Sequence, residues 1–216
     1  MGLPEIFIKF QTAAVTAITR SARGVLAVAL TDDTEGGAAE AVYKSLAEVP
    51  KDKFTAENYR LLELAFLAAP SKVHVLRVGE DDSAAFEALE RLSFDWLAAP
   101  GLDGTEVISF IKSQRAAGRG VKAVVANATA PDCEGIVNLC VSDLALEDGA
   151  IDAKDYAVRV AGLLAALPLT RSATYVSLPE VVSCAALDDP DGDVDAGKLV
   201  MVPAGTATAW AVPSTP

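Results

Sequence analysis

The stretch GLPEIFIKFQTAAVTAITRSARGVLAVAL, residues 2–30, carries two strand patterns separated by small residues. The second, Val25–Leu30, is apolar throughout, which is typical of a strand buried on both faces of a parallel sheet. The first alternates between two faces and consists of Ile6, Phe7, Ile8, Lys9 and Phe10. We therefore predict a core strand at Val25–Leu30, preceded by a short strand in an extended N-terminal arm.

Strand and helix patterns alternate along most of the remaining chain. Helices are predicted at Ala38–Val49, from an N-cap at Thr55 to Ala68, after an N-cap at Ser83, at Thr105–Ala117, and from an N-cap at Asp152 to Leu167. Further strands are predicted at Lys72–Val78, Asp95–Pro100, Val121–Asn127 and within Gly135–Leu146. This alternation indicates an α/β fold with a mainly parallel sheet covered by helices.

The pattern changes after residue 171. TYVSLPEVVSC is extended, DDPDGDVDAG is typical of an acidic turn, and the segments KLVMV and TATAWAV predict a C-terminal β-hairpin. We therefore expect three parts: an extended N-terminal arm at residues 1–20, an α/β core domain at 21–170, and a β-rich extension with the hairpin at 171–216.

Composition argues against nucleic-acid binding, membrane binding, a zinc site and a disulfide framework. The 216 residues carry a formal net charge of −12, and 51% of them are hydrophobic. Such a chain can bury a sizeable core, but its charge is poorly suited to nucleic-acid phosphates or anionic lipid. Cys133, Cys140 and Cys184 form no CxxC pattern, so we expect neither a zinc site nor a disulfide framework. Because no apolar run reaches the ~20 residues of a transmembrane helix, we expect no membrane insertion.

The sequence shows no signature of catalysis. His74 is the single histidine and lies within a predicted strand, so we interpret it as structural. The nearest approach to a phosphate loop is Gly36–Gly37, where Asp32, Asp33 and Glu35 would repel a pyrophosphate. We predict no catalytic residue, no cofactor and no metal. A small α/β nucleotide-binding protein or enzyme that uses this loop stays as the alternative.

Carboxylates alternate near the C-terminus in a pattern that is similar to a calcium loop: Asp189, Asp191, Asp193 and Asp195. Counted from Asp189, glycine stands fourth and valine twelfth, whereas an EF-hand has glycine sixth and glutamate twelfth. We therefore interpret this run as a solvated turn.

The opening segment GLPEIFIKFQTAAVTAITRSARGVLAVALTD resembles the N-terminus of contractile tail sheath proteins, especially those of Gram-positive phages and phage-derived particles. In that family a Gly-Leu-Pro start leads to an extended arm, a TAIxRSxRG segment and an apolar strand. The segment YAVRVAGLLAALPLTRSATYVSLPEV, residues 156–181, is similar to a family segment that follows a helix. DAGKLVMV, residues 195–202, is similar to the GKLV hairpin of the family, and the three segments lie in family order.

The resemblance implies a structural subunit of a contractile tail sheath, polymerised as stacked hexameric rings around a tail tube and contracting by rearrangement of subunit contacts. The implied partners are copies of itself, the tail tube protein, and the baseplate and tail terminator proteins. The implied location is a virion tail or phage-like particle, assembled in the bacterial cytoplasm.

Under this resemblance, Ile6–Phe10 is an inter-subunit strand donated to a sheet of a neighbouring copy, where backbone hydrogen bonds supply affinity. Pairing of this strand within its own chain is the alternative. Family members normally continue past the GKLV hairpin into a further α+β domain, which is absent from these 216 residues. We expect either an abbreviated subunit or one part of a longer product.

Overall fold

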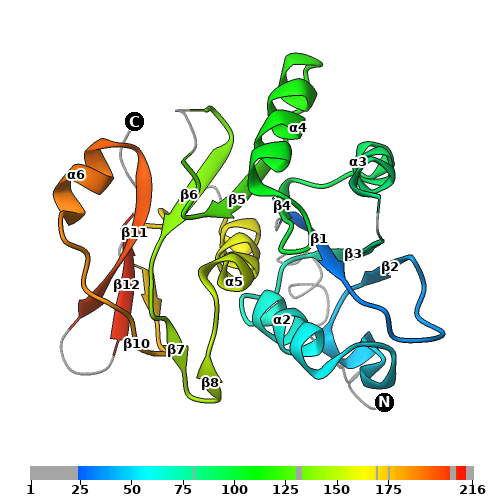
Figure 1. Ribbon diagram of the computed structural model, residues 1–216, viewed down its shortest axis with the longest axis horizontal. Coiled ribbons are helices and arrows are strands. Elements are labelled where there is room, and N and C mark those ends of the chain that lie inside the picture. The colour runs from blue at the N-terminus through cyan, green and yellow to red at the C-terminus, as the bar shows by residue number, and fades with distance from the viewer. Residues whose placement is uncertain are drawn as a thin grey trace, which may run out of the picture.

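The computed structural model describes residues 24–79, 81–129, 133–168, 170–174, 176–204 and 208–212. Its central feature is a nine-stranded sheet (Figure 1). In spatial order the strands are β2 (Glu40–Tyr43), β3 (Lys72–Val78), β1 (Val25–Thr31), β4 (Trp96–Ala98), β5 (Lys122–Ala126), β6 (Ile136–Cys140), β11 (Lys198–Ala204), β12 (Thr208–Val212) and β9 (Val176–Leu178). Neighbours from β3 to β11 are parallel, and the pairs at the two ends are antiparallel. The predicted mainly parallel α/β sheet is confirmed.

The other described elements are a small sheet and the helices. The small sheet consists of β10 (Val181–Ser183), β7 (Ala145–Leu146) and β8 (Gly149–Ala150). The helices are α2 (Ala56–Phe66), α3 (Asp82–Arg91), α4 (Gly104–Ala116), α5 (Ala153–Ala166), α6 (Pro190–Asp195) and the 3-10 turns Leu46–Glu48 and Lys51–Lys53. Among the described residues, none of these helices is both long and apolar enough to cross a bilayer.

Helices cover both faces of the large sheet (Figure 1). Leu26 and Val28 of β1 belong to the core beneath α2 and α5. Ala27 and Ala29, which alternate with them, belong to the core beneath α3 and α4. The unbroken apolar pattern of β1 therefore arises because both of its faces are buried.

The N-cap residues are those predicted from the sequence at α2 and α5, but the N-cap of α3 is a different residue. Thr55 Oγ1 accepts a hydrogen bond from Asn58 N (3.2 Å), and Asp152 accepts one from Lys154 N, as predicted. At α3 the prediction of Ser83 is wrong, because Asp81 is the N-cap and accepts from both Ser83 N and Ser83 Oγ. Ser83 already lies inside the helix, so its hydroxyl acts as a donor to the cap.

The helix predicted at Ala38–Val49 is wrong. The segment forms β2 at Glu40–Tyr43, followed by a 3-10 turn at Leu46–Glu48. β2 pairs antiparallel with β3, and its residues alternate between exposed and half-buried positions. Tertiary pairing with β3 thus overrides a weak local preference for helix, and Val42 and Tyr43 suit a half-buried sheet surface.

The acidic turn predicted at residues 188–197 contains a short helix, α6. Pro190 occupies its first turn, and Asp189 Oδ1 accepts a hydrogen bond from Gly192 N at 3.0 Å. Asp193 forms an ion pair with Lys198. The alternating carboxylates therefore serve a helix start and an ion pair.

The predicted C-terminal hairpin is confirmed by the antiparallel pairing of β11 with β12. β11 also pairs in parallel with β6, and β12 pairs with β9, so the hairpin continues the large sheet. The boundaries proposed for the three parts of the chain stay predictions.

Gly162 allows α5 to approach α2 closely. A Cβ atom at this position would lie 2.5 Å from the backbone oxygen of Ala65. We expect Gly162→Ala to lower the free energy of unfolding by about 1–3 kcal/mol, because the two helices must shift apart. Gly104→Ala is the matched control, since nothing lies within 4 Å of its Cβ position. Urea unfolding measures both variants, and equal stability of Gly162→Ala and the wild type would contradict the packing argument.

Candidate functional site at the carboxyl end of the sheet

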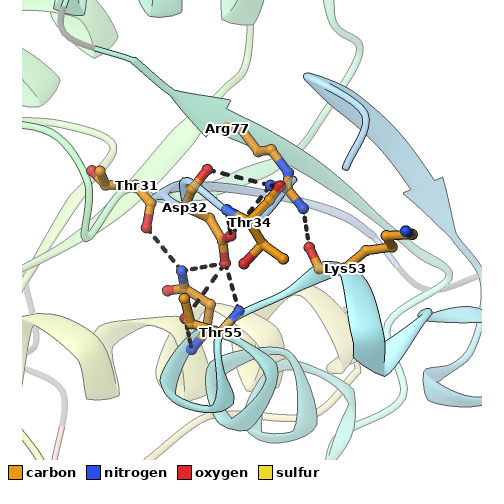
Figure 2. A network of polar contacts seen from close by, with 7 residues as sticks. Thr31, Asp32, Thr34, Lys53, Thr55 and Arg77 are labelled. Atoms are coloured by element: carbon orange, nitrogen blue, oxygen red, sulfur yellow. Dashed lines mark hydrogen bonds and ion pairs between the residues drawn. The ribbon is translucent and has the colours of Figure 1, made fainter. Parts of the chain in front are cut away.

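The loop that follows β1 begins with a buried carboxylate. Asp32 is 7% exposed and accepts hydrogen bonds from Thr34 N (2.9 Å), Thr55 N (3.0 Å) and Asn58 Nδ2 (2.7 Å). Figure 2 shows Asp32 between Arg77 and the start of α2. Asn58 also donates to the Thr31 carbonyl at 2.8 Å. These contacts fix the end of β1 against the first turn of α2.

Arg77 of β3 completes this polar cluster. Its Nη1 lies 3.2 Å from Asp32 Oδ1 and 3.0 Å from the Thr34 carbonyl, and its Nη2 donates to the Lys53 carbonyl. The Arg77 side chain is 9% exposed, and its guanidinium lies 4.8 Å from the centre of the Phe54 ring. Asp32 therefore neutralises the charge of Arg77 inside the protein, and backbone carbonyls accept hydrogen bonds from both Nη atoms, whereas Nε has no partner among the described residues.

Gly37 lies directly against Arg77. A Cβ atom at Gly37 would be 1.9 Å from Arg77 Nη2, so a larger residue would displace the guanidinium. Gly37 thus makes room for an internal arginine, whereas a Cβ atom at Gly36 would lie 3.2 Å from Lys53 Nζ. No feature of this loop calls for a phosphate.

Ionisation of Asp32 is coupled to the fold. Burial by itself would raise the pKa of Asp32, but hydrogen bonds from Asn58, Thr34 and Thr55 outweigh it and lower the pKa to about 2. The carboxylate is charged at neutral pH, and its oxygens are occupied by protein donors. Asp33 and Glu35, in contrast, are exposed to solvent. The cluster is therefore structural, which weakens the nucleotide-binding alternative.

A cleft of about 380 Å³ opens beside the cluster, where the strand order reverses between β1 and β4. In open α/β sheets this is the usual place for a ligand. Gly101 approaches the end of β1 so closely that a Cβ atom would lie 2.8 Å from Thr31 N. The charged residues that line the cleft are Glu57, Arg60, Asp152 and Asp155.

Charge in this cleft is negative and incompletely neutralised. Burial raises the pKa of Asp155, and repulsion from Asp152 and Glu57 acts in the same direction, whereas Lys154 and Arg60 oppose it. Such a cleft disfavours phosphate. Within the described part of the chain, no group of three or more His, Cys, Asp or Glu residues could hold a metal ion.

The surroundings of the single histidine and of two cysteines suit structural roles better than catalytic ones. His74 is buried in β3, and burial, followed by repulsion from Lys72, lowers its pKa, while Glu40 acts in the opposite direction. Neither ring nitrogen has a hydrogen-bond partner among the described residues, which suits a neutral imidazole. Burial also raises the pKa values of Cys140 and Cys184, so their thiols are poor nucleophiles.

The two terminal strands of the large sheet, β2 and β9, each pair with one neighbour in the described part of the chain. Unpaired strand edges are sites where a further strand can be added. β2 exposes 46% of Val42, which is unusual for a large apolar side chain. The predicted inter-subunit residues Ile6, Phe7, Ile8, Lys9 and Phe10 lie outside the described residues.

Arg77 and Asn58 are the members of the polar cluster that sequence reasoning did not identify. The sequence does hold one signal, because Arg77 is a charged residue near the carboxyl end of a strand in which apolar residues predominate. Parallel pairing places Arg77 opposite Leu30, two residues before Asp32. Only this register reveals that the two charges meet.

The fold is shared with contractile tail sheath proteins. The sheath tail protein from Listeria innocua superposes with a TM-score of 0.75 at 16% identity, covering 92% of this chain and 71% of that protein. The sheath tail protein from Desulfitobacterium hafniense gives 0.73 at 14% identity, over 97% and 74% of the two chains. The helical sheath of the anti-feeding prophage in the contracted state gives 0.63 at 12% identity, over 97% and 67%.

Sequence similarity identifies a particular relative. The tail sheath protein of Clostridium phage phiCD119 is 32% identical over 219 residues, which cover 93% of this chain and 59% of that protein. The chain thus spans about three fifths of the length of that relative. No family model matches the sequence. The predicted resemblance to tail sheath proteins is confirmed.

Proposed function

We propose that this chain acts as a structural subunit of a contractile tail sheath and has no catalytic role. The observation that carries the proposal is the 32% identity to a phage tail sheath protein over 93% of the chain. The Asp32 carboxylate, whose oxygens are occupied by protein donors, and the acidic cleft support it, because both disfavour the phosphates of a nucleotide.

Assembly would place copies of the chain in stacked six-membered rings around a tail tube, in contact with a baseplate and a tail terminator, within a phage tail or phage-like particle. Contraction would exchange one set of subunit contacts for another. Such a lattice needs two packing arrangements of different free energy and no nucleotide.

The strand Ile6–Phe10 would add to a sheet edge of a neighbouring copy. Charge supports such a contact: the arm, residues 1–20, contains Glu5, Lys9 and Arg20, a net charge of +1. Since the whole chain carries −12, residues 21–216 carry −13. A basic arm is therefore attracted to the acidic body of another copy, and this attraction weakens as salt is added.

Deleting residues 2–10 tests this function. We expect the variant to fold, since the described core begins at residue 24, but to lose polymer formation because the donated strand is missing. Negative-stain microscopy and sedimentation measure the polymer, and circular dichroism measures the fold. Striated tubes from the wild type and dispersed subunits from the variant are the expected result.

Two substitutions in the full chain separate strand donation from a simple loss of length. Ile6→Asp with Ile8→Asp places charges on one face of the strand and is expected to abolish polymers. Lys9→Ala, on the other face, is the control and should retain them. Normal tubes from the deletion variant would overturn the donated strand, and a wild type that never forms tubes would overturn the sheath function itself.

A further inference from the structure

A groove of about 500 Å³ lies at the amino ends of three adjacent strands, opposite to the acidic cleft. It is lined by Gly24 before β1, Trp96 of β4, Lys122 of β5, and the segment that ends α5 and follows it. Trp96, Leu164 and Leu167 are half-buried and provide an apolar floor. The groove therefore offers both shape and apolar surface for contact.

The groove is basic in a strongly acidic protein. Lys122 and Arg171 are exposed at its rim, and neither forms an ion pair with a described residue. Lys122 Nζ lies 5.1 Å from the centre of the Trp96 ring. The lining also holds one exposed carboxylate, Asp95, which accepts a 2.7 Å hydrogen bond from Val25 N and keeps its negative charge. With two cations and one carboxylate, the lining carries a net charge of +1, and the two cations at the rim remain without an ion pair to a described residue.

The opposite end of the sheet carries the complementary charge. Asp33 and Glu57 are exposed there. The cleft at this end is lined by three carboxylates and one cation: Glu57, Asp152, Asp155 and Arg60. Seven residues of β1 separate the two ends, a span of about 20 Å at the rise of a strand. The two ends of one molecule therefore cannot contact each other. The groove of one copy can, however, contact the carboxyl end of the sheet of another copy.

We propose that the basic groove at the amino ends of β1, β4 and β5 receives the acidic carboxyl end of the sheet of a second copy. The contact is heterologous, since each copy offers a groove at one end and carboxylates at the other. Contacts of this kind generate open stacks. The inference rests on the proposed sheath function and assigns to it a particular axial surface.

Charge reversal at each end provides the test. The groove variant is Lys122→Glu with Arg171→Glu, and the carboxyl-end variant is Glu57→Lys with Asp33→Lys; all four side chains are exposed. Each variant alone should form about tenfold less polymer than the wild type, because like charges then face each other. An equimolar mixture should recover polymer, since basic carboxyl ends meet acidic grooves and the unaltered ends also match.

Lys44→Glu with Lys112→Glu is the matched control for the groove variant, because it makes the net charge more negative by the same amount at residues outside the groove lining; it should polymerise as the wild type does. Circular dichroism establishes that every variant is folded. Wild-type polymer yield from either end variant, or a mixture that stays dispersed, would overturn the contact.

Cross-linking separates this inference from the sheath function. A carbodiimide couples Lys122 of an isotopically labelled copy to Glu57 of an unlabelled copy if the two ends meet. That cross-link without tubes would sustain the contact and overturn the sheath function. If tubes form without that cross-link and the four substitutions do not change their yield, the sheath function would be sustained and the proposed contact overturned.

Discussion

Asp32→Ala is expected to lower the free energy of unfolding by about 3–5 kcal/mol, which is the usual effect of removing one partner from a buried ion pair. The substitution leaves the guanidinium of Arg77 buried without its carboxylate and removes the acceptor of Thr55 N and Asn58 Nδ2. Urea unfolding at neutral pH measures the loss. Asp33→Ala, the exposed neighbour, is the matched control and should change stability by less than about 0.5 kcal/mol.

The pH dependence of stability gives a second measurement on the same variant. The pKa of Asp32 falls from its ordinary value of 3.8 to about 2 in the folded protein. Because the folded value is the lower one, the stabilisation is complete above pH 4 and is lost as the pH falls toward 2; it amounts to about 2 kcal/mol. Asp32→Ala should lack this component of the acid transition. If Asp32→Ala and the wild type lose stability equally between pH 4 and pH 2, the ionisation of Asp32 is not coupled to folding.

Glu180→Ala is expected to be the second large effect, with a loss of about 3–5 kcal/mol. Glu180 Oε1 accepts from Arg159 Nε at 2.6 Å and from Tyr156 Oη at 2.8 Å, both on α5. The Arg159 side chain is 7% exposed, so the substitution leaves a buried charge without its partner. Glu180 lies between β9 of the large sheet and β10 of the small sheet, and its loss should therefore loosen both sheets from α5.

Two further variants serve as references for the stability loss of Glu180→Ala. Glu180→Gln keeps an acceptor for Tyr156 while removing the charge, so its stability should fall between that of Glu180→Ala and that of the wild type. Glu147→Ala alters an exposed carboxylate and should have little effect. Thermal and urea unfolding both report the difference. A loss for Glu180→Ala no larger than that for Glu147→Ala would show that the buried pair contributes nothing net.

Stability and assembly are separate properties of this chain. Asp32 and Glu180 act on the folding of the subunit, whereas residues 2–10 and the two ends of the sheet would act between subunits. Variants of the first kind should change unfolding curves, and variants of the second kind should change polymer yield with unfolding curves intact. Measuring both quantities on every variant assigns each residue to one role.

The regular elements were predictable where local pattern and burial agree. Val25–Leu30, Lys72–Val78 and Val121–Asn127 appear as strands β1, β3 and β5 close to their predicted limits, because apolar residues predominate in strands that are largely buried on both faces. The Thr55 and Asp152 caps were predictable for a similar reason, since a cap acts within three residues of its own position. The resemblance to sheath proteins likewise rests on residues read in order along the chain.

The segment Glu40–Tyr43 could not be assigned from its own residues. Its local pattern allows a helix, and it becomes β2 because the edge of β3 offers backbone partners and half-buries one of its faces. Strand preference depends on such surroundings more than helix preference does.

By itself, the sequence determined the α/β layering, the main strands, the starts of α2 and α5, and the kinship with tail sheath proteins, because each depends on residues close together in the chain. Only the tertiary structure decided that Asp32 meets Arg77, that Glu180 meets Arg159, and that opposite charges gather at the two ends of the sheet. Those pairings depend on strand register and on the direction in which parallel strands run, and neither is recorded in any short stretch of residues.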